Sequence, residues 1–356
     1  MQRWKVAGIN FDHFHMGDNL QMAWEHPQVD LVAICDETPD RMTVAASRFQ
    51  LSDNQIFTNY EECIRATQPD IVLLCPAAAE HGLWAKRIAS SGAHVIVEKP
   101  FAASLAEADE MIAAMSAGGG QLVINWPMTW YATNRTAHRL IRENAIGEVV
   151  EVHYYDGNRG PLWHTAGKEE RTAEQVAAEK PNSWFYSRQH GGGAMQDYMG
   201  YGTTLATWFN GGKIPIEVTA IVDEPKGLEV DEHAIAVARY DVGLSKFETR
   251  WGTFTDPWTH QPQPKCGFVI VGTDGTIGSF DYQSTVRLQT RDCPDGRDIP
   301  VDEVTAPYQN PVQYLIDCLE TNSSVEGPSS AAISRIGQQI VDAAEQSARQ
   351  KRSIVL

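Results

Sequence analysis

The stretch GAHVIVEKP, residues 92–100, decides the fold of this 356-residue chain. An apolar run leads directly into a carboxylate, an ammonium and a proline, which has no N–H to donate to a sheet. Short apolar runs of this kind are typical of buried strands in a parallel sheet. Ligands bind such sheets beyond the carboxyl ends of the strands, so Lys99 is predicted to place a positive charge in a binding crevice.

The sequence around this stretch repeats the same organisation. Short apolar runs alternate with segments of helical periodicity through the first 125 residues, which predicts βαβ units. The expected strands are residues 4–9, 30–35, 70–75, 93–98 and 121–125, and the expected helices include residues 39–49, 80–91 and 105–115. We therefore expect an α/β fold that begins with a doubly wound parallel sheet.

The second half of the chain has the alternating pattern of half-buried strands. The expected strands are residues 148–155, 216–222, 233–240, 245–251 and 266–271, with a hairpin turn at residues 272–275. This pattern predicts an antiparallel sheet, which helices at about residues 311–320 and 331–350 follow. The charged, alanine-rich segment 168–180 is predicted to be an exposed helix or mobile loop.

Composition excludes several classes of partner. Lysine and arginine number 29 against 46 aspartate and glutamate residues, and the net charge of −17 disfavours nucleic acids and anionic membranes. No apolar stretch approaches the roughly 20 residues that span a bilayer. The six cysteines form no CxxC pair. A strand expected from residue 4 leaves no room for a signal peptide, so we expect a cytoplasmic protein with a small-molecule ligand.

Taken together, the motifs resemble the Gfo/Idh/MocA family, named after glucose-fructose oxidoreductase and inositol dehydrogenase. The resemblance covers essentially the whole chain and rests on Gly8, Asp36, Cys75-Pro76 with His81, the GAHVIVEKP stretch and GGGAMQD at residues 191–197. It implies a dinucleotide-binding Rossmann domain, residues 1–124. A substrate-binding and oligomerisation α+β domain, residues 125–356, is expected to carry a large open, mainly antiparallel sheet, and its last helix is the element that could pack back on the first domain.

The resemblance also implies a function. Most members move a hydride between a nicotinamide and a carbon of a sugar or polyol, so we expect an NAD-dependent oxidoreductase acting on a sugar, sugar derivative or cyclitol. Two alternatives stay open: a lyase, isomerase or glycosidase-like enzyme that oxidises its substrate transiently with tightly held NAD, and a non-catalytic sugar or dinucleotide sensor. A homodimer or homotetramer is expected, because the family's open sheets commonly pack face to face.

Nucleotide binding is where the chain departs from the common pattern. The dinucleotide fingerprint is G-x-G-x-x-G, whereas this chain has only the first glycine, Gly8, and carries Asn10 and His13 at the other two positions. Asparagine tolerates left-handed backbone, so Asn10 is expected to keep the turn. A carboxylate ending the second strand accepts ribose hydroxyls and repels a 2′-phosphate, so Asp36 favours NAD over NADP. The resemblance adds Pro76, His81, Glu98 and Lys99 to the expected cofactor site.

The expected catalytic residues are Lys99, Asp197 and Tyr201. In the family, a glycine-rich segment opens a helix that carries Asp in its first turn and, commonly, His four residues later. Here the second position is Tyr201. Residues i and i+4 share a helix face, so we expect Tyr201 to act as acid and base, with its pKa lowered by Lys99. Lys99 would polarise the substrate oxygen, and Asp197 would orient the substrate.

The region from residue 126 is rich in aromatic side chains and histidines, whose flat faces and donors suit a pyranose. The expected carbohydrate-binding residues are Trp126, Trp163, His164, Trp184, His190, Trp258 and His260. Pairs of histidines such as His13 and His15 match no metal-binding spacing, so no metal site is expected.

Overall fold

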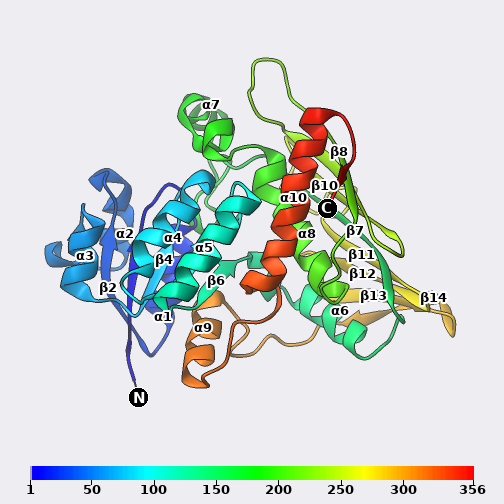
Figure 1. Cartoon of the computed structure of the whole chain (residues 1–356), viewed down its shortest axis with the longest axis horizontal. Coiled ribbons are helices and arrows are strands. Elements are labelled where there is room, and N and C mark those ends of the chain that lie inside the picture. Colours follow the sequence, from blue (N-terminus) through cyan, green and yellow to red (C-terminus); the bar gives the residue numbers. More distant parts are fainter. Residues whose placement is uncertain (1) are drawn as a thin grey trace.

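The computed structural model describes residues 2–356 and contains two sheets (Figure 1). The first is a parallel six-stranded sheet in the order β3-β2-β1-β4-β5-β6. Its strands are β1 (Trp4–Ile9), β2 (Val29–Cys35), β3 (Ile56–Phe57), β4 (Ile71–Leu74), β5 (His94–Glu98) and β6 (Leu122–Asn125). The predicted doubly wound sheet is confirmed.

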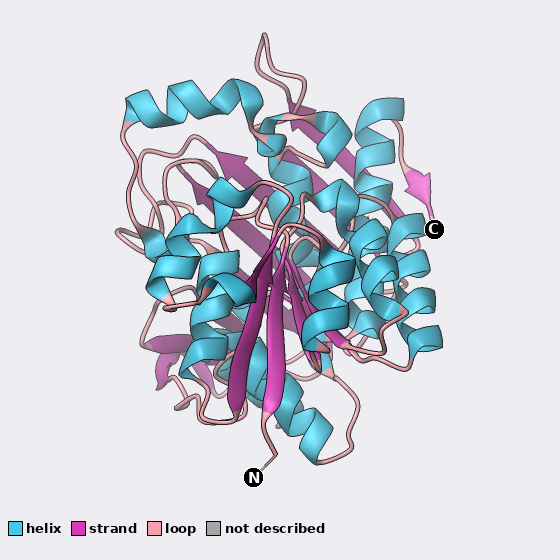
Figure 2. Ribbon diagram, turned by 90° about the vertical axis from the view of Figure 1, so that its left-hand side faces the viewer, coloured by secondary structure: helices cyan, strands magenta, loops and turns pink. Residues whose placement is uncertain are grey.

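Helices cover both faces of this sheet (Figure 2). One face packs against α1 (Met16–Glu25) and α9 (Pro311–Glu320), and the other packs against α3 (Tyr60–Thr67), α4 (His81–Ala89) and α5 (Leu105–Gly118). The helix predicted at residues 39–49 is a 3₁₀ turn, Pro39–Met42, followed by the short α2 (Thr43–Arg48). Because α9 follows β14 in the sequence, the chain returns to the first sheet before it adds the last strand, β15, to the second.

The second sheet has nine strands in the order β14-β13-β12-β11-β7-β10-β9-β8-β15. All its neighbouring pairs are antiparallel except β7 and β10, as the prediction of a mainly antiparallel sheet required. Its strands are β7 (Val149–Asn158), β8 (Glu217–Asp223), β9 (His233–Arg239), β10 (Leu244–Trp251), β11 (Gly267–Gly272), β12 (Gly275–Phe280), β13 (Thr285–Thr290), β14 (Cys293–Pro300) and β15 (Ile354–Val355). The sequence pattern does not predict β13, β14 or β15.

One face of this sheet is buried and the other is open. Alternate residues such as Tyr154, Phe247 and Phe268 are buried beneath α8 (Ala194–Phe209), whereas Ile221 and Ile235 on the opposite face are exposed. The remaining helices of this part are α6 (Ala132–Arg142), α7 (Ala173–Glu179) and α10 (Ala331–Gln350). As predicted for segment 168–180, α7 is mostly exposed.

The last helix, α10, contacts elements of both sheets. Arg335 on α10 forms a two-pronged ion pair with Asp109 on α5 at 2.5 and 2.8 Å. Farther along, Ser347 Oγ accepts a hydrogen bond from the Ala220 N–H of β8 at 2.9 Å. Helix α10 therefore bridges the two halves of the chain. Within residues 2–356, no helix combines the length and apolar character needed to cross a bilayer.

Candidate active site

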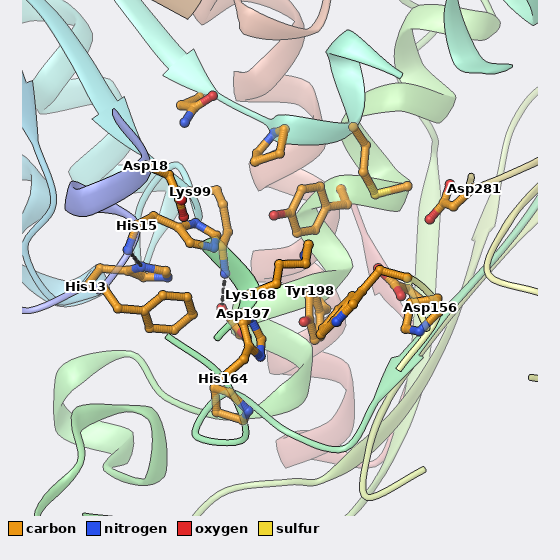
Figure 3. A pocket seen from close by; sticks show the side chains of 18 of the residues that line it. His13, His15, Asp18, Lys99, Asp156, His164, Lys168, Asp197, Tyr198 and Asp281 are labelled. Atoms are coloured by element: carbon orange, nitrogen blue, oxygen red, sulfur yellow. Dashed lines mark hydrogen bonds and ion pairs between the residues drawn. The ribbon is translucent and has the colours of Figure 1, made fainter. Parts of the chain in front are cut away.

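The site lies where the carboxyl ends of the parallel strands face the first turn of α8 (Figure 3). A cavity of about 220 Å³ opens there. His15 and Lys99 line it from the first sheet's side, and Asp197, Tyr198 and Tyr201 line it from α8. The cavity thus brings together the three residues that the sequence predicted to be catalytic.

The central contact of the site is an ion pair between Lys99 and Asp197. The Lys99 ammonium donates to Asp197 Oδ1, and both side chains are almost completely buried. The same ammonium lies 5.4 Å from the centre of the Tyr198 ring and 5.8 Å from that of Tyr201. Removing either partner would leave the other charge buried without a counter-ion. That would lower the free energy of unfolding by about 3–5 kcal/mol.

Behind Lys99, the carboxylate of Glu98 is fully buried in a polar cluster. Its Oε1 accepts a hydrogen bond from His15 Nδ1 at 2.8 Å, and its Oε2 accepts from Asn19 at 3.1 Å and from Asn125 at 2.9 Å. Burial alone would raise the pKa of Glu98, but His15, Lys99 and Asn19 bring it below its ordinary value. Glu98 therefore stays charged and fixes the strand end that carries Lys99.

The expected effect of Lys99 on Tyr201 is wrong. Burial, followed by the negative charge of Glu98 and by Tyr198, raises the pKa of Tyr201 well above its ordinary value. The Lys99 ammonium pairs with Asp197 instead of the phenol. At neutral pH, Tyr201 is thus a hydrogen-bond donor and a poor proton acceptor.

The start of α8 is held by a residue that the sequence analysis did not consider. Gly193, the N-cap, has φ +114° and ψ 151°, a conformation that glycine alone adopts readily, and it offers no capping side chain. Asp231 replaces that cap: its Oδ2 accepts from the Met195 N–H at 2.9 Å, and its carbonyl accepts from Ala194 N–H at 3.0 Å. Asp197 lies in the first turn of the same helix, so the contacts of Asp231 also help to position Asp197.

Replacing Asp231 by asparagine is expected to stabilise the protein at pH 7.5 but not at pH 4. Burial raises the pKa of Asp231 to about 6 from an ordinary value near 4. The folded state therefore binds the proton more tightly, and stability is lost as the pH rises through that window. The amide of Asp231→Asn would keep the acceptor without the charge, so we expect a gain of about 1–3 kcal/mol at pH 7.5. Urea unfolding of both proteins at the two pH values measures it; equal gains at both would contradict the assignment.

The turn after β1 supports the expected nucleotide site. A Cβ on Gly8 would lie 2.9 Å from the Leu20 side chain and 3.0 Å from that of Met16, so glycine favours the close packing of α1 on the strand. Asn10 adopts the predicted left-handed conformation, with φ +66°. The Asp36 carboxylate, at the end of β2, accepts from the Phe11 N–H at 2.7 Å and holds the turn.

Three cavities adjoin one another along this edge of the sheet. One of about 350 Å³ is lined by Asn10, Asp36 and Arg41, and the next, of about 660 Å³, shares Arg41 and Asp12 with it. That second cavity in turn shares Phe14 and His164 with the cavity at Lys99. Neighbouring cavities therefore lie along the sheet edge from Asp36 to Lys99. Arg41 forms an ion pair with Asp12. Its positive charge compensates the Asp12 carboxylate, which alone would repel a pyrophosphate.

Of the two histidines at this turn, His13 is buried and His15 is partly buried, and both are hydrogen-bonded. His13 Nδ1 accepts from the His15 N–H at 3.1 Å, which leaves the proton of the neutral ring on Nε2, a buried atom without a partner. Burial lowers the pKa of His13 well below its ordinary value. His13, His15 and Glu98 come within 4.8 Å of one another, but their hydrogen bonds already account for the arrangement, and we propose no metal there.

The other predicted residues divide between the cavities and the core. His164 and Trp258 line the cavity at Lys99, whereas Trp184 and His190 line the neighbouring cavity, where Trp184 donates to the Asp12 carbonyl at 3.2 Å. The remaining predicted residues lie outside these cavities. Trp126 is core, hydrogen-bonded to Ser334; His81 is buried against the Pro76 and Phe101 carbonyls; Trp163 and His260 line none of these cavities.

Sequence reasoning missed the far side of the cavity. Asp156 of β7 and Asp281, just after β12, are both buried there, and burial raises the pKa of each carboxyl. Asp281 Oδ1 has no hydrogen-bond partner among the described residues. Lys168 is exposed, as predicted for its segment, and it also lines the cavity. Period-two alternation identified β7 as a strand, but an inward carboxylate on it carried no recognisable signal.

Comparison with known proteins agrees with this geometry. Residues 3–125 match the family model described as an oxidoreductase family with an NAD-binding Rossmann fold, and residues 134–278 match the model of the GFO/IDH/MocA C-terminal domain. The chain belongs to this oxidoreductase family. The resemblance drawn from the sequence motifs is thereby confirmed.

Individual relatives within the GFO/IDH/MocA family are distant. The D-apiose dehydrogenase of Paraburkholderia graminis is 29% identical over 148 residues, 41% of this chain and 38% of that protein. The chain thus aligns with well under half the length of this relative. Among solved structures, the aldose-aldose oxidoreductase of Caulobacter crescentus superposes with a TM-score of 0.78 at 20% identity over 100% of both chains. A levoglucosan dehydrogenase in complex with NADH and levoglucosan gives 0.76 at 18% over 99% of both. These structures share the fold.

Proposed function

We propose that this protein is an NAD-dependent dehydrogenase or reductase that acts on a CH–OH group of a sugar, a sugar derivative or a cyclitol. The observation that carries the proposal is the row of three neighbouring cavities from Asp36 to the buried Lys99–Asp197 pair. A row of this kind suits an elongated dinucleotide whose reactive end meets a second, small ligand. Solved relatives bound to NADH and a sugar support the same reading.

The residues along this row fit a dinucleotide. Asn10 and the turn that it forms would face the pyrophosphate, and the unpartnered Nε2–H of His13 is a donor for the same ligand. Asp36 would accept the ribose hydroxyls, which favours NAD over NADP. When bound, the nicotinamide would accept a hydride from the substrate carbon.

At the substrate end, the chain's own residues would handle the oxygen of the reacting CH–OH group. Lys99 would donate a hydrogen bond to it and stabilise negative charge there, which in a buried site is worth far more than in water. Asp197 would hold the Lys99 ammonium in place and accept from a neighbouring hydroxyl. Tyr201 would donate to the substrate, since its raised pKa keeps the phenol protonated.

The wider setting is part of the proposal. We propose a cytoplasmic homo-oligomer with domains at residues 1–124 and 125–356 and no nucleic-acid or membrane partner. The open face of the second sheet supports assembly, because Ile221 is 76% exposed, and Ile235 and Val269 are each 37% exposed. Sedimentation velocity tests assembly directly, and a monomer at all concentrations would contradict it.

Cofactor release is the direct test of the function. The purified protein is denatured, released nucleotide is identified by mass spectrometry, and the stripped chain is titrated with NAD and NADP. Reversible NAD binding with NADH formed from a sugar would support the proposal. Tightly held NAD without net NADH would favour a lyase or isomerase that recycles its cofactor, and binding of neither nucleotide would overturn the enzyme assignment.

Replacing Asp36 by alanine is expected to weaken NAD binding about tenfold and to improve NADP binding relative to NAD. The carboxylate that accepts ribose hydroxyls is lost, while Arg41 remains nearby to meet a 2′-phosphate. Fluorescence titration with both nucleotides measures the ratio. The matched control is Asp40→Ala, an exposed carboxylate on the following turn. An unchanged ratio in Asp36→Ala would remove Asp36 from the cofactor site.

A further inference from the structure

Two aspartates stand in one row across the buried face of the second sheet. Gly267 of β11 pairs with the residue before Asp156 on β7 and with the residue before Asp281 on β12. One position along, Cys266 lies between the two aspartates, and the Asp281 N–H donates to the Cys266 carbonyl at 3.0 Å. Two strand spacings place the backbones of Asp156 and Asp281 about 10 Å apart with their side chains on the same face. Both line the cavity at Lys99, and Figure 3 shows them on the side away from the histidines of the β1 turn.

Only one of these two carboxyl groups is matched by the protein itself. Asp156 Oδ2 accepts a hydrogen bond from the Tyr154 hydroxyl at 3.0 Å. Asp281 is only 3% exposed, yet its Oδ1 has no hydrogen-bond partner among the described residues. Its backbone is fixed, because its N–H is bonded to Cys266 and its carbonyl accepts from the Gln261 amide at 2.7 Å. A carboxyl group is thus held at the cavity wall with an acceptor atom unpaired, which is costly in a buried place.

The charge of the cavity is also unbalanced. Within residues 2–356, the carboxyl groups that line it are four and the lysines two: Asp18, Asp156, Asp197 and Asp281 against Lys99 and Lys168. Lys99 is paired with Asp197, and the exposed Lys168 places its Nζ 3.7 Å from the centre of the Trp258 ring. Burial raises the pKa of both Asp156 and Asp281, and the charge of Lys168 opposes that rise only in part. The far wall of the cavity therefore lacks a positive group.

The surroundings favour an organic ammonium group over a metal ion. Four tyrosine rings line the same cavity: Tyr131, Tyr198, Tyr201 and Tyr282. Aromatic faces attract ammonium groups, and both lysines of the cavity already lie over such faces. A hard metal ion needs several ligands, whereas the group of three metal-ligating side chains found within residues 2–356 is His13, His15 and Glu98, on the other side. Two carboxyl groups beside aromatic rings suit an amine.

We propose that Asp156 and Asp281 bind a protonated amino group of the substrate, so that the substrate is an amino sugar or an aminocyclitol. This inference rests on the proposed dehydrogenase function, and the amino group would lie away from the CH–OH group that meets Lys99. The ammonium would donate hydrogen bonds to Asp281 Oδ1 and to Asp156 and would compensate their charge. A hydroxyl in its place would donate a single hydrogen bond and leave the charge uncompensated.

The preference for an amine is measured without turnover. Isothermal titration calorimetry at pH 7 in EDTA, with and without NAD, compares glucosamine with glucose, galactosamine with galactose, and scyllo-inosamine with scyllo-inositol. We expect at least one amine to bind at least about tenfold more tightly than its neutral counterpart, because charge-assisted hydrogen bonds are stronger than neutral ones. N-acetylation of that amine should remove the advantage. Failure of every amine to bind more tightly than its counterpart would overturn the proposal.

Two isosteric variants assign the preference to these residues. Asp281→Asn and Asp156→Asn keep the size of the side chain and remove its charge. Each should weaken binding of the amine at least about tenfold and leave that of the neutral counterpart within about threefold of wild type. Asp292→Asn, which changes an exposed carboxylate, is the matched control and should keep the preference. A preference that survives in both Asp281→Asn and Asp156→Asn would overturn the proposal, and thermal unfolding confirms that each variant is folded.

Turnover separates this inference from the function on which it rests. NADH formed from a neutral sugar, with no preference for any amine, would keep the dehydrogenase function and overturn the role of Asp156 and Asp281. A preference for an amine that is lost in Asp281→Asn, with no NADH formed from any ligand, would support the amine-binding role and count against the dehydrogenase function.

Discussion

Replacing Lys99 by methionine is expected to lower kcat/KM at least about 10³-fold and to destabilise the fold by about 3–5 kcal/mol. The catalytic loss follows from removing the donor that would stabilise charge on the substrate oxygen. The loss of stability follows because Asp197 stays buried without its partner. NAD titration, steady-state kinetics and urea unfolding measure the three quantities, and NAD affinity should change little.

Two further variants separate these effects. Lys99→Met combined with Asp197→Asn removes both charges, so much of the lost stability should return while activity stays absent. Lys86→Met breaks an exposed ion pair with Glu110 and should cost less than about 1 kcal/mol with full activity. Activity within tenfold of wild type in Lys99→Met would refute the proposed role of Lys99.

Replacing Gly193 by alanine is expected to lower the free energy of unfolding by about 3–5 kcal/mol and to reduce activity at least about tenfold. An alanine Cβ would lie 2.6 Å from Asp231 Oδ1 and would also be strained at φ +114°. Relief of that clash moves Asp231 away from the first turn of α8, and with it Asp197 moves relative to Lys99. Urea unfolding and kcat measure both consequences.

Gly227 supplies the matched control, because it has φ +93° but nothing within 4 Å of an added Cβ. Gly227→Ala should therefore show only the backbone cost, about 1–2 kcal/mol, with normal kcat. If the two alanine variants behave alike, the close approach of Asp231 to Gly193 does not position the helix.

The parts of the fold that followed from sequence are those with a clear period. GAHVIVEKP predicted a strand and its ligand-facing end because apolar runs in a parallel sheet are continuous. Asn10 was placed in a left-handed turn for a reason specific to its side chain, and the structure has it there. By contrast, β14 contains Pro294, Asp295 and Gly296, residues that disfavour strands, and is formed only because β13 offers an edge to pair with.

The site could be predicted only where residues share a local motif. Lys99 and Asp197 each stood in such a motif, but their ion pair joins residues 98 positions apart. Lys168 gave no signal because its segment is charged and alanine-rich, and composition cannot tell which lysine of an exposed segment also lines a cavity. Trp126 was predicted to contact the ligand but is buried beneath α8. An aromatic side chain in the core and one in a binding site cannot be told apart from sequence alone.

The bridge formed by α10 bears on how ligands enter and leave. With Arg335 bound to α5 and Ser347 bound to β8, a wide hinge opening would have to break contacts along the whole helix. The turn at residues 165–168 is held to α1 chiefly by the hydrogen bond from Gly167 to Asp18. Breaking that contact needs much less free energy than separating α10 from both sheets. We therefore expect the cavity at Lys99 to open by local release of that turn, with fast amide hydrogen exchange there and slow exchange in α10.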